Sequence, residues 1–132
     1  MKGVDLPVRP VDVTAFTSFT MSQKAIDTEH LSRQTGGDRE LERELLTLFA
    51  QQCATHLRTI HGSADPKARL DAAHSLKGAA LAVGAWQVAE AADRIEQDLG
   101  QGDKHPTEAA MDALTLAAAE ARAVICRCDC AA

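Results

Sequence analysis

The stretch that decides the fold runs from Asp65 to Gly84 and reads DPKARLDAAHSLKGAALAVG. It opens with Asp65 and Pro66, a capping residue followed by a proline in the first turn, which is typical of a helix start. It closes at Gly84, which allows a tight reversal. At about 100° per residue, five apolar residues cluster on one side of the intervening helix: Ala72, Leu76, Ala79, Ala80 and Val83. The stretch therefore predicts an amphipathic helix that ends at about Val83 and buries this face.

Four further segments around this helix have helical character. A short helix is expected over 28–35, capped by Asp27 and ended by two glycines at 36 and 37. Longer helices are expected over 39–61, 85–100 and 107–126, each with apolar residues recurring at intervals of three and four. Their expected core positions are Leu41, Leu45, Leu48, Phe49, Cys53, Leu57 and Ile60, then Ala85, Val88, Ala92, Ile95 and Leu99, then Met111, Leu114, Ala118, Ala121 and Ile125. The sequence therefore predicts an all-α protein, an antiparallel up-and-down four-helix bundle with a short additional N-terminal helix.

The composition agrees with one helical domain and excludes several function classes. The chain has 132 residues, 45% hydrophobic and 25% charged, with three Phe, one Trp and no Tyr. So few aromatic residues argue against an all-β fold. The net charge of −5 gives no electrostatic footprint for nucleic acid or an anionic membrane surface. No apolar stretch approaches the roughly 20 residues of a membrane span, and the N-terminus lacks the apolar region of a signal peptide. We therefore expect a cytoplasmic monomer whose four cysteines are thiols.

The character of the chain changes near Met21. Residues 1–20 are rich in Pro, Thr and β-branched residues and show no helical period. We expect them to form a disordered N-terminal tail, with the bundle over 21–127 and a flexible C-terminal tail over 128–132.

The candidate chemistry lies on the face opposite the apolar one. That face carries His74 at mid-helix, together with Leu70, Asp71, Lys77, Gly78 and Leu81. A lone surface histidine usually has no special role. Gly78 is the unusual feature, because glycine costs about 0.5–1 kcal/mol relative to alanine inside a helix. One turn after an exposed histidine, it leaves room for a bulky group on the imidazole.

The residue types around His74 suit phosphoryl transfer. A neutral imidazole is a good nucleophile that can take up a phosphoryl group. The Lys77 ammonium would offset the negative charge of that group. Leu81 offers apolar area to a docking partner.

The segment His74-Ser75-Leu76-Lys77-Gly78-Ala79-Ala80, followed by Val83-Gly84, resembles the signature of histidine-containing phosphotransfer (HPt) domains. The Gly36-Gly37-Asp38 turn and the apolar residues after it resemble the second helix of that family, so the resemblance covers about 26–125. It implies a bundle in which His74 is the phosphoacceptor, Lys77 the charge partner and Gly78 the space-maker. It also implies Glu96 as the group that hydrogen-bonds the other imidazole nitrogen. Ala79 and Ala80 stand where many members have Ser.

The resemblance also implies partners. The phosphoryl group would pass reversibly between His74 and the aspartate of a response-regulator receiver domain, in a relay fed by a hybrid histidine kinase. The Mg²⁺ for the transfer would come from the receiver, and this chain would bind no cofactor of its own. Expected partner-binding residues are Leu70, Asp71, Leu81 and Trp86.

The sequence is also compatible with two other functions. The protein could be a helical adaptor without phosphotransfer, or the phosphoacceptor hairpin of a kinase, although Ser75 follows the histidine where those kinases usually have Glu or Asp. The chain has no nucleotide-binding glycine motif. Trp86 could be a partner anchor or a cover for the end of the bundle.

The C-terminal cysteines are candidate metal ligands. Cys126, Cys128 and Cys130 alternate, so they cannot share one helix face. A thiophilic metal site there lacks a fourth ligand, and we expect thiols on a frayed end.

Overall fold

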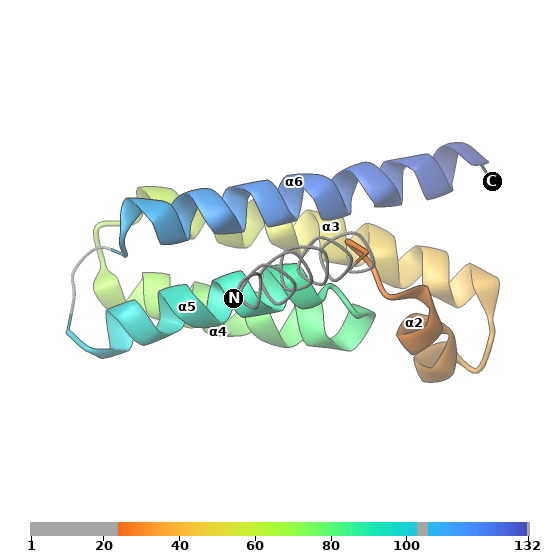
Figure 1. Ribbon diagram of the computed structural model, residues 1–132, viewed down its shortest axis with the longest axis horizontal. Coiled ribbons are helices and arrows are strands. Elements are labelled where there is room, and N and C mark those ends of the chain that lie inside the picture. Colours follow the sequence, from red (N-terminus) through yellow and green to blue (C-terminus); the bar gives the residue numbers. More distant parts are fainter. Residues whose placement is uncertain (1–23, 103–105, 132) are drawn as a thin grey trace, which may run out of the picture.

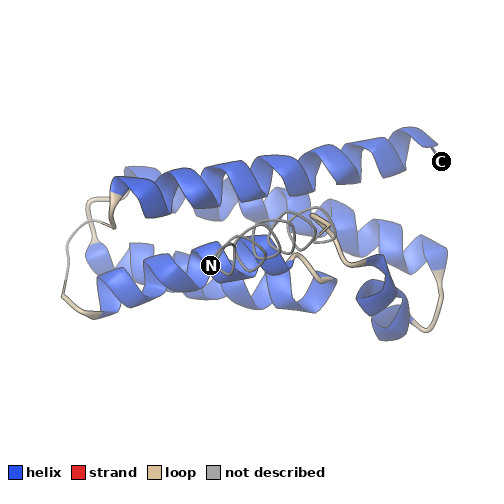
Figure 2. Cartoon of the chain, in the orientation of Figure 1, coloured by secondary structure: helices blue, strands red, loops and turns tan. Residues whose placement is uncertain are grey.

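The computed structural model describes residues 24–102 and 106–131, with the side chains of 128–131 left aside. The described chain forms five helices and no strand (Figures 1 and 2). They are α2 (Thr28–Thr35), α3 (Arg39–Gly62), α4 (Pro66–Val83), α5 (Trp86–Gly100) and α6 (Glu108–Ala131). The all-α prediction is confirmed. The expected tail over 1–20 lies outside the described residues.

The helix starts and ends follow from capping. The side chains of Asp27, Asp38 and Asp65 each accept a hydrogen bond from a backbone N–H in the first turn of the helix that follows. Gly36 and Gly84 end α2 and α4 in the left-handed conformation, with φ of 67° and 81°. The predicted end near residue 126 is wrong, because α6 continues to Ala131. The backbone of 128–131, expected as a tail, is therefore helical.

The four long helices close into a bundle. Each of α3, α4, α5 and α6 packs against its neighbours in sequence, and α3 also packs against α6 (Figure 1). This ring of contacts is the up-and-down arrangement. Each long helix buries large apolar side chains in one core, as Phe49, Leu76, Ile95 and Leu114 illustrate. In the described part of the chain, no helix is long and apolar enough to cross a membrane.

Two predicted core positions of α3 are wrong. Leu41 is 38% exposed and Leu48 is 48% exposed, so both lie at the margin of the buried stripe. The helices that pack against α3, namely α2, α4 and α6, leave these two side chains partly uncovered. The inner positions Phe49, Cys53 and Ile60 are buried as expected. Burial raises the pKa of the Cys53 thiol to about 11, so Cys53 is a core residue without thiolate character.

The junction of α2 with the bundle explains Trp86. The indole Nε1–H donates to Asp27 Oδ2 at 2.9 Å, and the ring meets the His30 imidazole edge-on, with centroids 4.8 Å apart. The backbone N–H of Asp27 also donates to the carbonyl of Gly84 at 2.9 Å. A Cβ on Gly84 would lie 3.0 Å from the Asp27 carbonyl oxygen, so this close approach needs glycine. Trp86 therefore covers the end of the bundle, and its expected part in partner binding stays a prediction.

A buried arginine fixes the opposite turn. Arg69 is 5% exposed, and its Nε–H donates to the carbonyl of Ile60 at 2.8 Å. This bond satisfies an acceptor in the last turn of α3 and ties it to the first turn of α4. The hydrogen bond therefore ties the two helices together at the α3–α4 connection.

Candidate functional site

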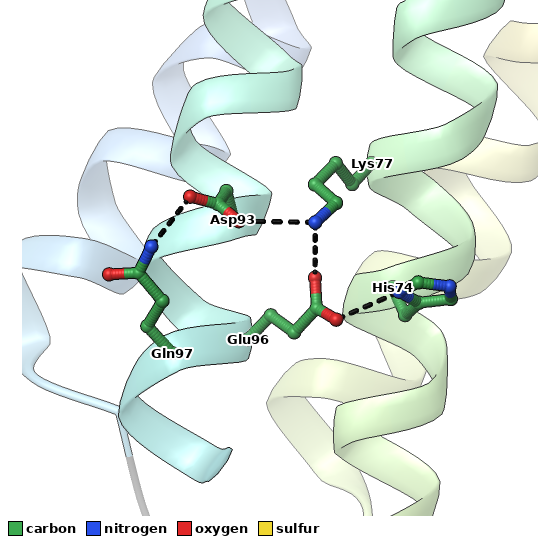
Figure 3. Close-up of polar contacts among 5 residues, drawn as sticks. All are labelled: His74, Lys77, Asp93, Glu96 and Gln97. Carbon is green, nitrogen blue, oxygen red and sulfur yellow. Dashed lines mark hydrogen bonds and ion pairs between the residues drawn. The ribbon is translucent and has the colours of Figure 1, made fainter. Parts of the chain in front are cut away.

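His74 projects from the middle of α4 toward solvent. Its side chain is 69% exposed, and Nδ1 lies 2.8 Å from Glu96 Oε2 on α5 (Figure 3). The two residues meet because α4 and α5 form a hairpin about Gly84, and each lies a similar distance along the chain from that reversal. The predicted pairing of His74 with Glu96 is thus present in the structure.

The Glu96 carboxylate determines which nitrogen of His74 is free. Partial burial would raise the pKa of Glu96, but hydrogen bonds from Lys77 and His74 outweigh this and lower it. Glu96 is therefore ionised near neutral pH and can only accept hydrogen bonds. Nδ1 must then carry the proton. In the neutral imidazole this leaves the lone pair of Nε2 free, which is the arrangement required of a nucleophile.

Lys77 lies beside Glu96 rather than beside the free nitrogen. Its Nζ is 2.9 Å from Glu96 Oε1 and 3.1 Å from Asp93 Oδ1. The hydrogen bonds to Glu96 and Asp93, in that order, raise the pKa of Lys77, so the ammonium stays charged. One oxygen of Glu96 thus binds Lys77 and the other binds His74, which fixes the carboxylate in place.

Two members of this cluster, Asp93 and Gln97, were not predicted from the sequence. Asp93 accepts from Lys77, and its second oxygen accepts a 2.8 Å hydrogen bond from Gln97 Nε2 (Figure 3). Asp93 and Gln97 are one turn apart on the polar side of α5, and Glu96 lies between them in sequence. The available signal was that Asp93 and Glu96, three apart, share a helix face.

The other predicted site residues surround His74 in different degrees of exposure. Gly78 is exposed, and a Cβ added there would meet nothing within 4 Å. Leu81 is 46% exposed. Asp71 is exposed and paired with Lys67 at 3.1 Å. Leu70 packs partly against the core, so it offers a partner less exposed area than its position on the helix suggests. Packing inside the protein therefore does not require glycine at position 78. The effect of this glycine is to leave open space on the surface next to His74.

His74 lies on the exposed surface of α4. A groove of about 470 Å³ runs between α5 and α6 and is lined on its α5 side by Asp93 and Gln97, but His74 is not part of it. Within the described residues, no three His, Cys, Asp or Glu side chains gather in a way that could hold a metal ion. The side chains of Cys128 and Cys130 lie outside that description. An exposed nucleophile outside this groove suits a partner that brings its own concave site.

Comparison with known proteins agrees with this geometry. The family model described as "Hpt domain" matches residues 44–124. No curated protein matches the chain. Among solved structures, a putative histidine-containing phosphotransfer protein from rice superposes with a TM-score of 0.66 at 19% identity, covering 88% of this chain and 87% of that one. The structural likeness shows a shared fold, and the family match runs from within α3 to within α6 and includes His74. The chain belongs to the Hpt domain family.

Proposed function

We propose that the protein is a phosphorelay intermediate that carries a phosphoryl group on His74 to and from the aspartate of response-regulator receiver domains. The observation that carries the proposal is an exposed imidazole whose Nδ1 is held by an ionised carboxylate, with nothing of the cluster placed on Nε2. The family membership supports the same role.

The transfer step follows from the tautomer. The Nε2 lone pair attacks phosphorus of the receiver's aspartyl phosphate, a P–N bond forms, and the P–O bond to the aspartate breaks. The electron pair of that bond leaves with the aspartate carboxylate. The ring keeps its Nδ1 proton and becomes positively charged, and Glu96 at 2.8 Å stabilises that charge. The reverse step returns the group and restores the neutral ring.

The remaining residues have distinct roles in this proposal. Glu96 orients the imidazole, and Lys77 both fixes Glu96 and supplies positive charge near the phosphoryl group. Gly78 leaves space for the receiver's active site to approach. Leu81, with Leu70 and Asp71 at the margin, forms the docking surface around the histidine. The Mg²⁺ for the transfer belongs to the receiver, whose acidic pocket supplies it. The cluster positions groups and charge, which is the main contribution a protein makes to phosphoryl transfer.

Two other functions explain the cluster less well. A helical adaptor has no need of a hydrogen bond that selects one histidine tautomer. A kinase hairpin uses an acidic residue beside its histidine as a base, and Ser75 occupies that position here. We therefore propose a carrier without kinase activity of its own, supplied with phosphoryl groups by a hybrid histidine kinase.

The experiment is phosphotransfer from purified receiver domains labelled with radioactive phosphate. The wild-type chain should take up label, and His74→Gln should take up none while keeping its helical circular dichroism. His61→Gln is the matched control, because His61 is also exposed but bonds Thr115 on the α3–α6 side. An adaptor would leave the wild-type chain unlabelled with every receiver.

A further inference from the structure

The polar cluster beside His74 contains two residues, Asp93 and Gln97, to which the family resemblance assigns no role. Gln97 binds Asp93 at 2.8 Å, and Asp93 binds Lys77 at 3.1 Å. Lys77 binds Glu96 at 2.9 Å, and Glu96 binds His74 at 2.8 Å. Asp93 has no assigned role in the proposed transfer, yet it shares the single ammonium of Lys77 with Glu96.

The position of the Lys77 ammonium shows why this sharing matters. Nζ lies between two carboxylates of α5, on the side of the imidazole that carries Nδ1 (Figure 3). The two ring nitrogens point in diverging directions, so a phosphoryl group on Nε2 would lie on the other side. The flexible lysine side chain must give up part of its contact with the carboxylates to approach that group.

Asp93 is well placed to restrain the lysine. Gln97 fixes one carboxylate oxygen of Asp93, so the other remains directed at Nζ. The Asp93 side chain is itself 42% exposed, and the Lys77 side chain is 26% exposed. The pair is therefore partly exposed, and removing it should cost little stability while it changes what holds the lysine.

We propose that Asp93 is a positioning residue that competes with the phosphoryl group for the ammonium of Lys77. This inference rests on the proposed function, since it concerns how His74 accepts the group. Asp93 and Glu96 together hold Lys77 in the unphosphorylated chain, which keeps Glu96 oriented toward His74. As the phosphoryl group arrives, the hold of Asp93 limits how readily Lys77 turns toward it. Removing the Asp93 charge should free the ammonium and speed acceptance.

The test uses phosphoramidate as the donor, because it needs no partner protein. The Nε2 lone pair attacks its phosphorus, the P–N bond of the donor breaks, and ammonia leaves. Asp93→Asn should accelerate phosphorylation of His74 about two- to five-fold, the range expected for losing one exposed ion pair. Glu90→Gln is the matched control, since it removes the same charge one turn away on the same helix, and it should leave the rate near that of wild type.

A Lys77→Gln background provides the decisive readout. If Asp93 acts through Lys77, adding Asp93→Asn to Lys77→Gln should change the rate no further. Acceleration that persists in this background, or that Glu90→Gln reproduces, would show a general charge effect and overturn the inference. A second readout is the pKa of Lys77 followed by ¹⁵N NMR, which Asp93→Asn should lower and Glu90→Gln should not.

The outcomes separate the inference from the proposed function. If the wild-type chain is phosphorylated at His74 and Asp93→Asn reacts at the same rate, the inference is wrong and the proposed function stands. If neither phosphoramidate nor any labelled receiver modifies His74, both are wrong.

Discussion

Substitutions of Gly78 should change the stability of the protein and its phosphotransfer rate in different directions. In the structure Gly78 lies in the interior of α4, one turn after His74, and an added Cβ would meet nothing within 4 Å. Substitution should therefore introduce no clash. Gly78→Ala should stabilise the protein by about 0.5–1 kcal/mol, because alanine loses less backbone freedom in a helix. For a chain of this size, that corresponds to a rise of roughly 2–6 °C in Tm.

Gly78→Gln extends the argument to activity. Glutamine is also a good helix former, so the fold should be kept and Tm should not fall. Its side chain would occupy the open space beside His74 that a receiver's active site must enter. Transfer from a labelled receiver should slow by roughly tenfold or more, since small displacements of reacting groups are costly. Thermal unfolding and the initial rate of phosphotransfer, measured on the same samples, give both quantities.

Gly62→Gln serves as the matched control for this pair of measurements. Gly62 is the last residue of α3, away from His74, and an added Cβ there would also meet nothing within 4 Å. Its transfer rate should equal that of wild type. Transfer at the wild-type rate by Gly78→Gln would refute the space-maker role. Unfolding of both Gly78 variants would instead show that Gly78 packs against a neighbour, contrary to the geometry.

Three further outcomes are expected. Arg69→Met should destabilise the protein by about 1–3 kcal/mol in chemical denaturation, because the buried Ile60 carbonyl loses its donor; a cost near zero would mean that water replaces it. Gly84→Ala should lower stability by about 1–3 kcal/mol, since φ is 81° and the new Cβ would crowd the Asp27 carbonyl, and an unchanged Tm would contradict this. The pKa of Glu96 is lowered in the folded state, so its contribution to stability is present above the ordinary glutamate pKa of 4.5 and is lost as pH falls below it. The difference in Tm between wild type and Glu96→Gln should therefore stay nearly constant from pH 7 to pH 5 and shrink as the pH is lowered below 4.5, and a difference that grows there would have the wrong sign.

Much of the fold follows from local sequence signals. The three aspartate caps place the starts of α2, α3 and α4, and the left-handed glycines place the ends of α2 and α4. These signals act within a few residues of each other. Leu41 and Leu48 show the limit of periodicity. The pattern identifies the apolar stripe, but which of its edge positions the neighbouring helices cover is a tertiary property. The continuation of α6 to Ala131 was missed because the alternating cysteines carry no strong helix signal.

The candidate site was also predicted only in part from the sequence. The orientation of His74 away from the core could be derived from α4 alone. The contact with Glu96 was expected only through the family resemblance, because the register between α4 and α5 depends on how tightly the chain turns at Gly84. Asp93 was not predicted for that reason, since its carboxylate gains a role only once Lys77 lies opposite it. The contact that Trp86 makes with Asp27 likewise depends on where α2 packs, which the spacing of apolar residues does not show.

The central claim is that Nε2 of His74 is the atom that carries the phosphoryl group. The direct measurement is heteronuclear NMR of the ¹⁵N-labelled chain after phosphorylation by a receiver domain, read through the coupling between ³¹P and the imidazole nitrogens. The account predicts one phosphorus, coupled to Nε2 of His74, with the proton retained on Nδ1 toward Glu96. Phosphorus on Nδ1 of His74, or on a different histidine, would contradict it.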